Sequence, residues 1–176
     1  MKKFLILLII IGSLFLVQTS FAQVSSQSAT IDYTLPYPGI LPDNPLYFFK
    51  VLRDRIVSFL ISDPSKKAEF DLLSADKRLS GSIALFDKGE KDLAEQTVSK
   101  GENYFEDGIK KLKISEREGT PIDPNLLTNM ELSSKKHKEI LTGFVESTNG
   151  KLKDRFQNDL KRASQFVTEV LQFKSK

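Results

Sequence analysis

The chain has 176 residues, a formal net charge of +3, one histidine and no cysteine. A single histidine without cysteine excludes the usual zinc ligand sets, and no metal or other cofactor is expected. Lysine and arginine are interleaved with the acids, which excludes the clustered basic face that nucleic-acid binding requires.

Residues 1–22 have the three parts of a secretory signal peptide. Lys2 and Lys3 precede an apolar run from Phe4 to Val17, and small residues at positions 20 and 22 predict cleavage after Ala22. The run of about 14 residues is shorter than the roughly 20 that span a membrane. An uncleaved anchor stays open as the alternative. We expect an exported protein, whether periplasmic, secreted or at the cell surface.

Removal of 22 residues from 176 leaves 154, which suits one domain that buries a core without disulfides. Residues 23–32 are small and polar and predict a flexible tether. Residues 33–45 hold four prolines between apolar side chains. Five of these side chains project from the extended backbone: Tyr33, Leu35, Tyr37, Ile40 and Leu41. We favour a strap buried between helices over a segment displayed, with Tyr47, to a partner or a sugar.

The rest of the chain predicts helices. A short helix over 45–61 is followed by a helical hairpin over 64–117 and a second over 124–173. Three Asn-Pro or Asp-Pro pairs mark helix starts, since the first residue caps and the proline fits the first turn: Asn44-Pro45, Asp63-Pro64 and Asp123-Pro124. The short helix is expected to supply core residues, namely Leu46, Phe48, Phe49, Leu52, Ile56, Phe59 and Leu60.

The two hairpins carry apolar or small residues at alternating spacings of three and four, which predicts one buried stripe per helix. The four stripes are Ala68, Leu72, Ala75, Leu79, Ser82 and Phe86; Ala94, Val98, Gly101, Phe105, Gly108 and Leu112; Leu127, Met130, Ser134, His137, Leu141 and Phe144; and Leu152, Phe156, Leu160, Ala163, Val167 and Val170. Short connections favour antiparallel neighbours. We therefore predict an all-α up-and-down bundle of four to five antiparallel helices after a proline-rich strap.

Gly101 and Gly108 lie one heptad apart on a buried stripe. Glycine inside a helix lowers its stability by about 1 kcal/mol relative to alanine, so two glycines on a buried stripe need a structural reason. We expect them to make room for Phe70 or Phe86, or for close backbone approach, rather than to form a hinge or cleft.

Few residues point to catalysis. His137 lies on a buried stripe and is expected to be a hydrogen-bonded core histidine, although Ser133 and Ser134 are near enough in sequence to act as a nucleophile. Glu106 with Asp107, and Asp87 with Glu90 and Asp92, offer carboxylate pairs that could act on a sugar. Carboxylates mixed with lysines on a helix are usually solvated. No catalytic or metal-binding residue is predicted, and we expect no enzyme.

The segment LPYPGILPDNPLYFFK, a short helix, and then DPSKKAEFDLLSADKRL resemble a family of exported bacterial domains of unknown function. The resemblance covers about residues 33–112 and rests on a proline-rich pattern close to LPYPGILPDxPLYxxK. It implies an exported helical domain and supplies no activity or catalytic residue.

Together these features favour a non-enzymatic scaffold or binding domain of the bacterial cell envelope. Two alternatives are a chaperone-like holder of unfolded chains and an envelope glycan hydrolase that uses paired carboxylates. The expected partner is an unknown envelope protein or glycan, with a homodimer as a further option and a membrane only if the signal is uncleaved.

Overall fold

The computed structural model describes residues 30–175, so the predicted signal peptide and most of the predicted tether lie outside the described residues. Of these, residues 31–175 cluster as one compact unit. Its helices are α2 (Tyr47–Leu60), α3 (Pro64–Asp87), α4 (Lys91–Glu118), α5 (Pro124–Glu146) and α6 (Gly150–Lys174). No strand occurs in residues 30–175, and none of the helices there is long and apolar enough to cross a membrane.

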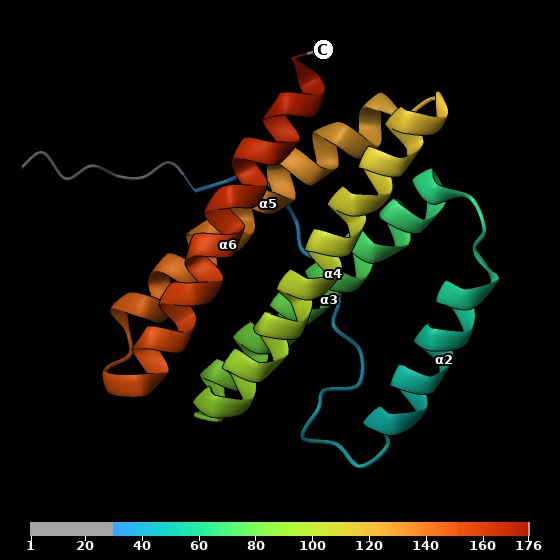
Figure 1. The fold of residues 1–176 in the computed structure, drawn as a ribbon. Coiled ribbons are helices and arrows are strands. Elements are labelled where there is room, and N and C mark those ends of the chain that lie inside the picture. The colour runs from blue at the N-terminus through green and yellow to red at the C-terminus, as the bar shows by residue number, and fades with distance from the viewer. Residues whose placement is uncertain (1–29, 176) are drawn as a thin grey trace, which may run out of the picture. The chain divides into compact units, whose positions relative to one another are not determined.

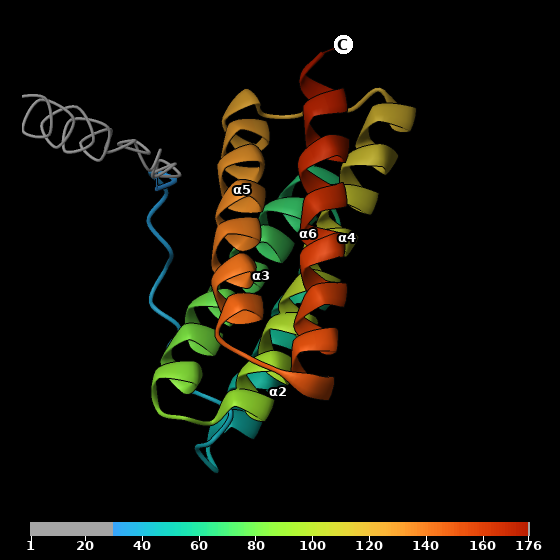
Figure 2. The same cartoon turned by 90° about the vertical axis from the view of Figure 1, so that its left-hand side faces the viewer.

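The bundle is built from two helical hairpins (Figure 1). α3 packs along α4 and α5 along α6, and the hairpins meet mainly where α4 contacts α6. Figure 2 shows α5 and α6 running side by side and joined by a tight connection. The predicted all-α bundle is confirmed.

All three predicted capping side chains accept a backbone N–H, but only Asp63 and Asp123 stand directly before their helices. Asp63 accepts a hydrogen bond from the Lys66 N–H at 2.8 Å, and Asp123 accepts one from the Asn125 N–H at 2.8 Å. Asn44 Oδ1 accepts from the Leu46 N–H at 2.9 Å, and the Tyr47 N–H donates to the Asn44 carbonyl at 3.0 Å, so a turn over residues 44–47 precedes the helix. α2 therefore begins at Tyr47, two residues later than the sequence predicts.

The core follows most of the predicted stripes, but Leu126 and Phe166 are buried where the sequence predicts Leu127 and Val167, which are half-buried. One buried cluster includes Ala68, Phe105, Met130 and Phe166, and a second includes Leu79, Val98, Leu141, Phe144 and Phe156. The rings of Phe105 and Phe166 stack with centroids 5.0 Å apart. Both clusters draw on all four bundle helices, so the core needs no contribution from α2.

The two glycines on α4 lie where α3 and α4 approach each other closely. A Cβ atom on Gly101 would lie 3.1 Å from Arg78 Cβ and 3.2 Å from the Ala75 carbonyl oxygen. A Cβ on Gly108 would lie 3.4 Å from the Ala68 carbonyl oxygen. The expected packing role is confirmed in its close-approach form, whereas Phe70 and Phe86 are not the neighbours.

α2 departs from the prediction that it supplies core residues. None of its residues is buried, and it makes no more than a marginal contact with any other helix in residues 30–175. Figure 1 shows it beside the bundle. The predicted core set is exposed, with Phe48 at 66%, Phe49 at 64% and Phe59 at 84%. That expectation is wrong because α3 turns its apolar stripe toward α4, leaving no core for α2 to join.

Candidate functional site

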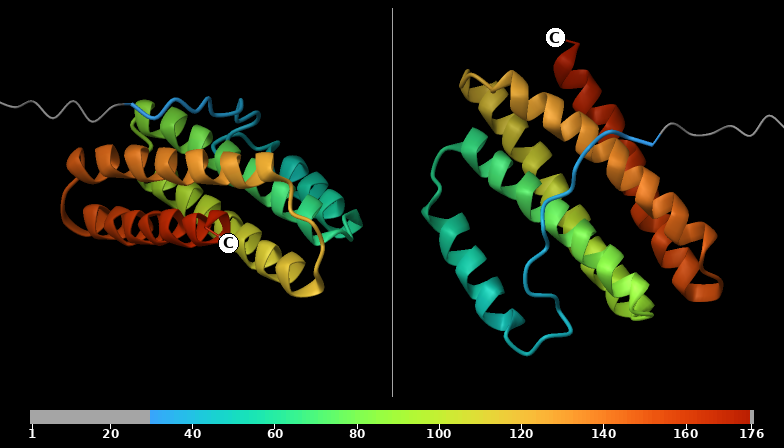
Figure 3. Two further views of the ribbon diagram at one scale, coloured as in Figure 1. Left: turned by 90° about the horizontal axis from the view of Figure 1, so that it is seen from above. Right: turned by 180° about the vertical axis from the view of Figure 1, so that it is seen from behind.

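The proline-rich segment of residues 31–45 crosses α5 and α3 on one face of the bundle (Figure 3, right). At its start the Ile31 N–H donates to Glu139 of α5 at 2.9 Å. Further along, a Cβ on Gly81 of α3 would lie 3.4 Å from Leu41 and 3.7 Å from Pro38. Contacts with both hairpins fix the course of the segment.

The six residues singled out from the sequence divide into two groups. Tyr33, Leu35, Leu41 and Tyr47 are half-buried, and Leu35 packs against the second core cluster. Tyr37 is 83% exposed and Ile40 is 40% exposed. The segment thus covers the bundle with one set of side chains and presents another to solvent.

Lys50 connects the segment to α2. Its ammonium donates to the Pro38 carbonyl at 2.5 Å and to the Ile40 carbonyl at 3.2 Å, and it lies 5.5 Å from the centroid of the Tyr47 ring. A cavity of ≈ 390 Å³ separates the turn at Gly39 from α2, with Phe49 and Lys77 among its lining residues. α2 is held in place by this connection and by its half-buried inner face.

A polar network inside the bundle joins three helices to the strap. Asp76 of α3 accepts hydrogen bonds from the Tyr33 hydroxyl at 2.6 Å and from the Ser133 hydroxyl at 2.5 Å. His137 of α5 places Nε2 3.2 Å from Asp76 and Nδ1 2.7 Å from Glu102 of α4. His137 and Glu102 have no solvent-exposed surface. The predicted core histidine is confirmed, with two carboxylate partners.

The carboxylates set the charge of the histidine. Burial alone would lower the pKa of His137, but the charges and hydrogen bonds of Glu102 and Asp76 outweigh it and raise the pKa to about 9. At neutral pH the ring is therefore an imidazolium that donates from both nitrogens. Burial, the charge of Asp76 and the bond to it also raise the pKa of Tyr33, which stays a donor.

This network does not have the arrangement of a nucleophilic site. The Ser133 hydroxyl donates to Asp76 rather than to the histidine, and Ser134 donates to the Glu131 carbonyl at 2.8 Å. A protonated imidazole cannot accept a proton from a serine, and no solvent reaches it. The network acts as an electrostatic link between α3, α4, α5 and the strap.

A further buried carboxylate, that of Asp159 on α6, lies near this network. Burial, followed by the charge of Glu102, raises the pKa of Asp159 to about 7. Asp159 Oδ2 and Glu102 Oε2 are both buried without a hydrogen-bond partner. The sequence reasoning missed Asp76, Glu102 and Asp159. Their only signal is that each is an acid directly beside a position of a buried stripe.

The first carboxylate pair proposed for a hydrolase, Glu106 and Asp107, is engaged with cations. Glu106 lies 2.9 Å from Lys110 and 3.2 Å from Arg162, and Asp107 lies 3.2 Å from Lys110. The hydrogen bond from Lys110 is the largest cause that lowers the pKa of Glu106. A glycosidase needs one carboxyl with a raised pKa as its acid, whereas the pKa of Glu106 is lowered.

Asp71 of α3 is a buried carboxyl on which the charge of Asp107 acts. Burial, followed by the charge of Asp107, raises the pKa of Asp71 to about 6. Of the second proposed set, Asp87 and Glu90 are exposed at the end of α3, and Asp92 pairs with Arg155 of α6. In residues 30–175, no group of three or more His, Cys, Asp or Glu side chains could hold a metal ion.

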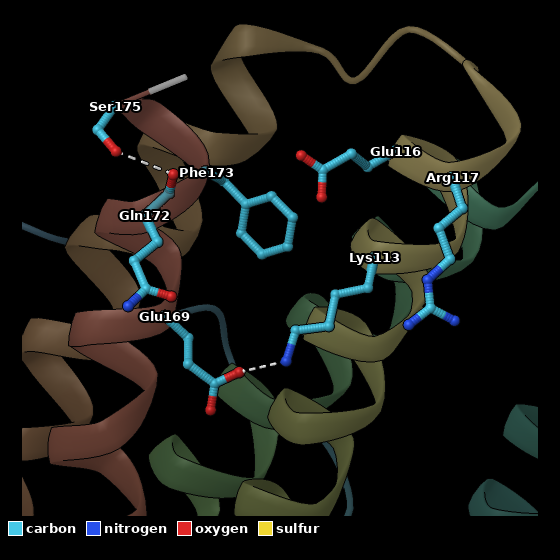
Figure 4. A pocket seen from close by; sticks show the side chains of 7 residues that line it. All are labelled: Lys113, Glu116, Arg117, Glu169, Gln172, Phe173 and Ser175. Carbon is cyan, nitrogen blue, oxygen red and sulfur yellow. Dashed lines mark hydrogen bonds and ion pairs between the residues drawn. The ribbon is translucent and has the colours of Figure 1, made fainter.

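An open pocket of ≈ 420 Å³ lies between the C-terminal ends of α4 and α6 (Figure 4). Lys113 and Glu169 form an ion pair of 2.6 Å across it, and the Phe173 ring projects into the space between the helices. The remaining lining residues are Glu116, Arg117, Gln172 and Ser175. They form no base and nucleophile pair.

Most of the exposed large hydrophobic side chains in residues 30–175 belong to α2 and lie on its outer face. At 100° per residue, six side chains share one arc of the helix, and all six are exposed: Phe48, Phe49, Leu52, Ile56, Phe59 and Leu60. Arg55 borders the arc on one edge and Arg53 on the other. We call this surface the α2 outer face.

Comparisons with known proteins give one match. No curated protein and no solved structure matches the chain. A family model described as "Domain of unknown function (DUF5667)" matches residues 39–172, which include the strap turn, α2 and nearly all of the bundle. Because this match covers well over half of the sequence, the chain belongs to that family.

Proposed function

We propose that the protein is an exported, non-enzymatic module of the bacterial cell envelope that acts by binding through its surface. The observation that carries this proposal is the α2 outer face. Taking about 200 Å² for an aromatic side chain, its three phenylalanines alone expose roughly 400 Å² at 66%, 64% and 84% exposure. A patch of that size on a soluble domain usually marks an interaction site.

The absence of enzymatic activity in this proposal rests on the state of the ionisable groups. The one histidine is an imidazolium sealed among carboxylates, and the surface pair Glu106 and Asp107 is neutralised by lysine and arginine. Neither arrangement supplies an acid and a base to a solvent-accessible substrate.

The first test addresses export and activity. The full chain with a C-terminal tag is expressed in a bacterium, and the mass of the exported product is measured. We expect a product that begins at Gln23 and that does not digest cell-wall glycan. A product retained in the cytoplasm would overturn export. Digestion abolished by Glu106→Gln with Asp107→Asn would establish the hydrolase instead.

A chaperone-like holder is the second candidate, because the exposed phenylalanines of α2 could also engage unfolded chains. Suppression of aggregation of a model client, measured by light scattering, distinguishes the two. Suppression at stoichiometric concentration that is lost in Phe48→Ser with Phe59→Ser would favour the holder. If the wild type does not suppress aggregation of the client, a module that binds a defined surface is favoured.

A further inference from the structure

The composition of the α2 outer face defines a narrow class of partner. Its arc is wholly apolar, and three of its six side chains are phenylalanines. Both of its edges carry arginine, and no acid lies within it. The single acid of α2 is Asp54, which lies on the half-buried face beside α3 and pairs with Arg53 at 2.7 Å. α2 therefore has three basic residues and one acid.

Basic groups continue from α2 onto the adjacent part of α3. Lys77 lines both cavities between α2 and its neighbours, and Arg78 lines the one of ≈ 250 Å³ between α2 and α3. Burial is the largest cause that lowers the pKa of Lys50, and the charge of Arg78 lowers it next. With Arg53 and Arg55 of α2, these basic residues give this edge of the domain an excess of positive charge, which attracts an anionic surface.

An apolar arc of phenylalanine, leucine and isoleucine flanked by arginines is the pattern of a helix that lies in a membrane interface. The arc enters the boundary between headgroups and acyl chains, while the arginines extend to the phosphates. α2 has 14 residues, so its axis is about 21 Å long and offers a flat strip rather than a span. The outer face is continuous over nearly this whole length.

We infer that the α2 outer face docks the domain onto the surface of an anionic phospholipid bilayer. In this arrangement α2 lies in the membrane interface and attaches the bundle to the bilayer surface. The strap and Lys50 fix the position of α2 relative to the bundle. This inference takes from the proposed function only the choice of a bacterial membrane, and it is tested on vesicles in vitro, independently of export.

Two other occupants fit the charges less well. A second copy paired antiparallel through this face would bring Arg53 and Arg55 of both copies along shared borders, and the arc holds no acid to pair with them. The apolar residues 4–17 of the same chain are predicted to be removed with the signal peptide. An anionic bilayer satisfies both the apolar arc and its basic edges.

The test measures binding of residues 23–176 to vesicles by co-sedimentation. This chain retains every helix that builds the two core clusters, and it lacks the apolar N-terminal run, which would bind lipid by itself. Vesicles of phosphatidylcholine are compared with vesicles that contain phosphatidylglycerol. We expect binding to the anionic vesicles, weaker binding to the neutral ones, and a loss of binding as salt is raised.

Variants separate the apolar and the electrostatic contributions. Phe48→Ser with Phe59→Ser should abolish binding, and Arg53→Glu with Arg55→Glu should weaken binding to anionic vesicles about tenfold or more. Two control variants carry the same kinds of change elsewhere on the domain. Tyr37→Ser with Leu171→Ser removes two exposed apolar side chains, and Lys100→Glu with Arg117→Glu makes the same charge change on α4. Both controls should bind vesicles like the wild type. Circular dichroism confirms that each variant is folded.

Three results would overturn the inference. The first is no binding by the folded wild type to either kind of vesicle. The second is equal binding by the α2 variants and their controls. The third is a stable wild-type dimer in analytical ultracentrifugation that is absent in Phe48→Ser with Phe59→Ser and that anionic vesicles do not dissociate. This result would assign the α2 outer face to a second copy of the chain.

Discussion

The buried imidazolium makes the stability of the domain depend on pH in the alkaline range. In the folded chain the pKa of His137 is about 9, whereas an unfolded histidine titrates near 6.5. The folded state therefore holds the proton more tightly. Its contribution to stability is complete below about pH 6.5 and is lost as the pH rises through 9. Stability should fall across this window.

The size of the effect follows from the difference in pKa. A difference of about 2.5 units at about 1.4 kcal/mol per unit gives roughly 3 kcal/mol between pH 6.5 and pH 9. For a domain of this size the midpoint should drop by roughly 6–12 °C. Other groups add little here, because Asp71 and Asp159, with pKa values of about 6 and 7, lose their protons mainly at lower pH.

The assay is urea unfolding of residues 23–176, followed by far-ultraviolet circular dichroism at several pH values. Since the chain has one histidine, ¹³C-histidine labelling also gives a single imidazole signal whose titration reports the folded pKa directly. His137→Gln should remove the slope between pH 6.5 and 9. Should that variant fail to fold, Glu102→Gln removes the largest attraction and should move the titration to lower pH. An imidazole that titrates at or below pH 6.5 in the wild type would refute the reasoning.

Three further predictions concern stability. Gly101→Ala should lower the free energy of unfolding by about 1–3 kcal/mol, because the new Cβ would press on the Ala75 carbonyl and Arg78 Cβ. In the same denaturant assay Gly143→Ala, whose Cβ has open space, should raise the free energy of unfolding by up to about 1 kcal/mol. Tyr33→Phe should cost about 2 kcal/mol by leaving a buried oxygen of Asp76 without its donor, and a calorimetric midpoint within 1 °C or so of the wild type would contradict this. Asp159 has a raised pKa, so its protonated form is favoured and stability is lost as the pH rises from about 4 to 7; Asp159→Asn should flatten the denaturation profile in that window and stabilise the domain at pH 8 by at least about 1 kcal/mol.

The buried stripes were predictable because helical periodicity is local. Apolar residues at spacings of three and four define one face of a helix whatever it packs against, and Leu79, Phe105, Leu141 and Phe156 all became fully buried. The capping acids Asp63 and Asp123 act within two or three residues of their own positions, so they too could be identified from sequence.

The same local argument failed for α2. Its apolar arc has the periodicity of a core helix, and the sequence alone cannot distinguish a face that meets a neighbour from one that meets solvent. The outcome depended on α3, whose apolar stripe packs on α4 and is thereby unavailable to α2. Asn44 is a smaller case, since its side chain accepts from the Leu46 N–H as expected but a turn over residues 44–47 delays the start of α2 to Tyr47.

By itself the sequence determined the helical class, the order of the helices and most of the residues that face the core, because these depend on spacings of a few positions along one chain. Only the tertiary structure decided that His137 meets Asp76 and Glu102, that the strap tyrosine completes this network, and that α2 turns its phenylalanines outward. These features join residues between 35 and more than 60 positions apart, or depend on which faces of neighbouring helices are already occupied. No short-range pattern in the chain encodes such distances.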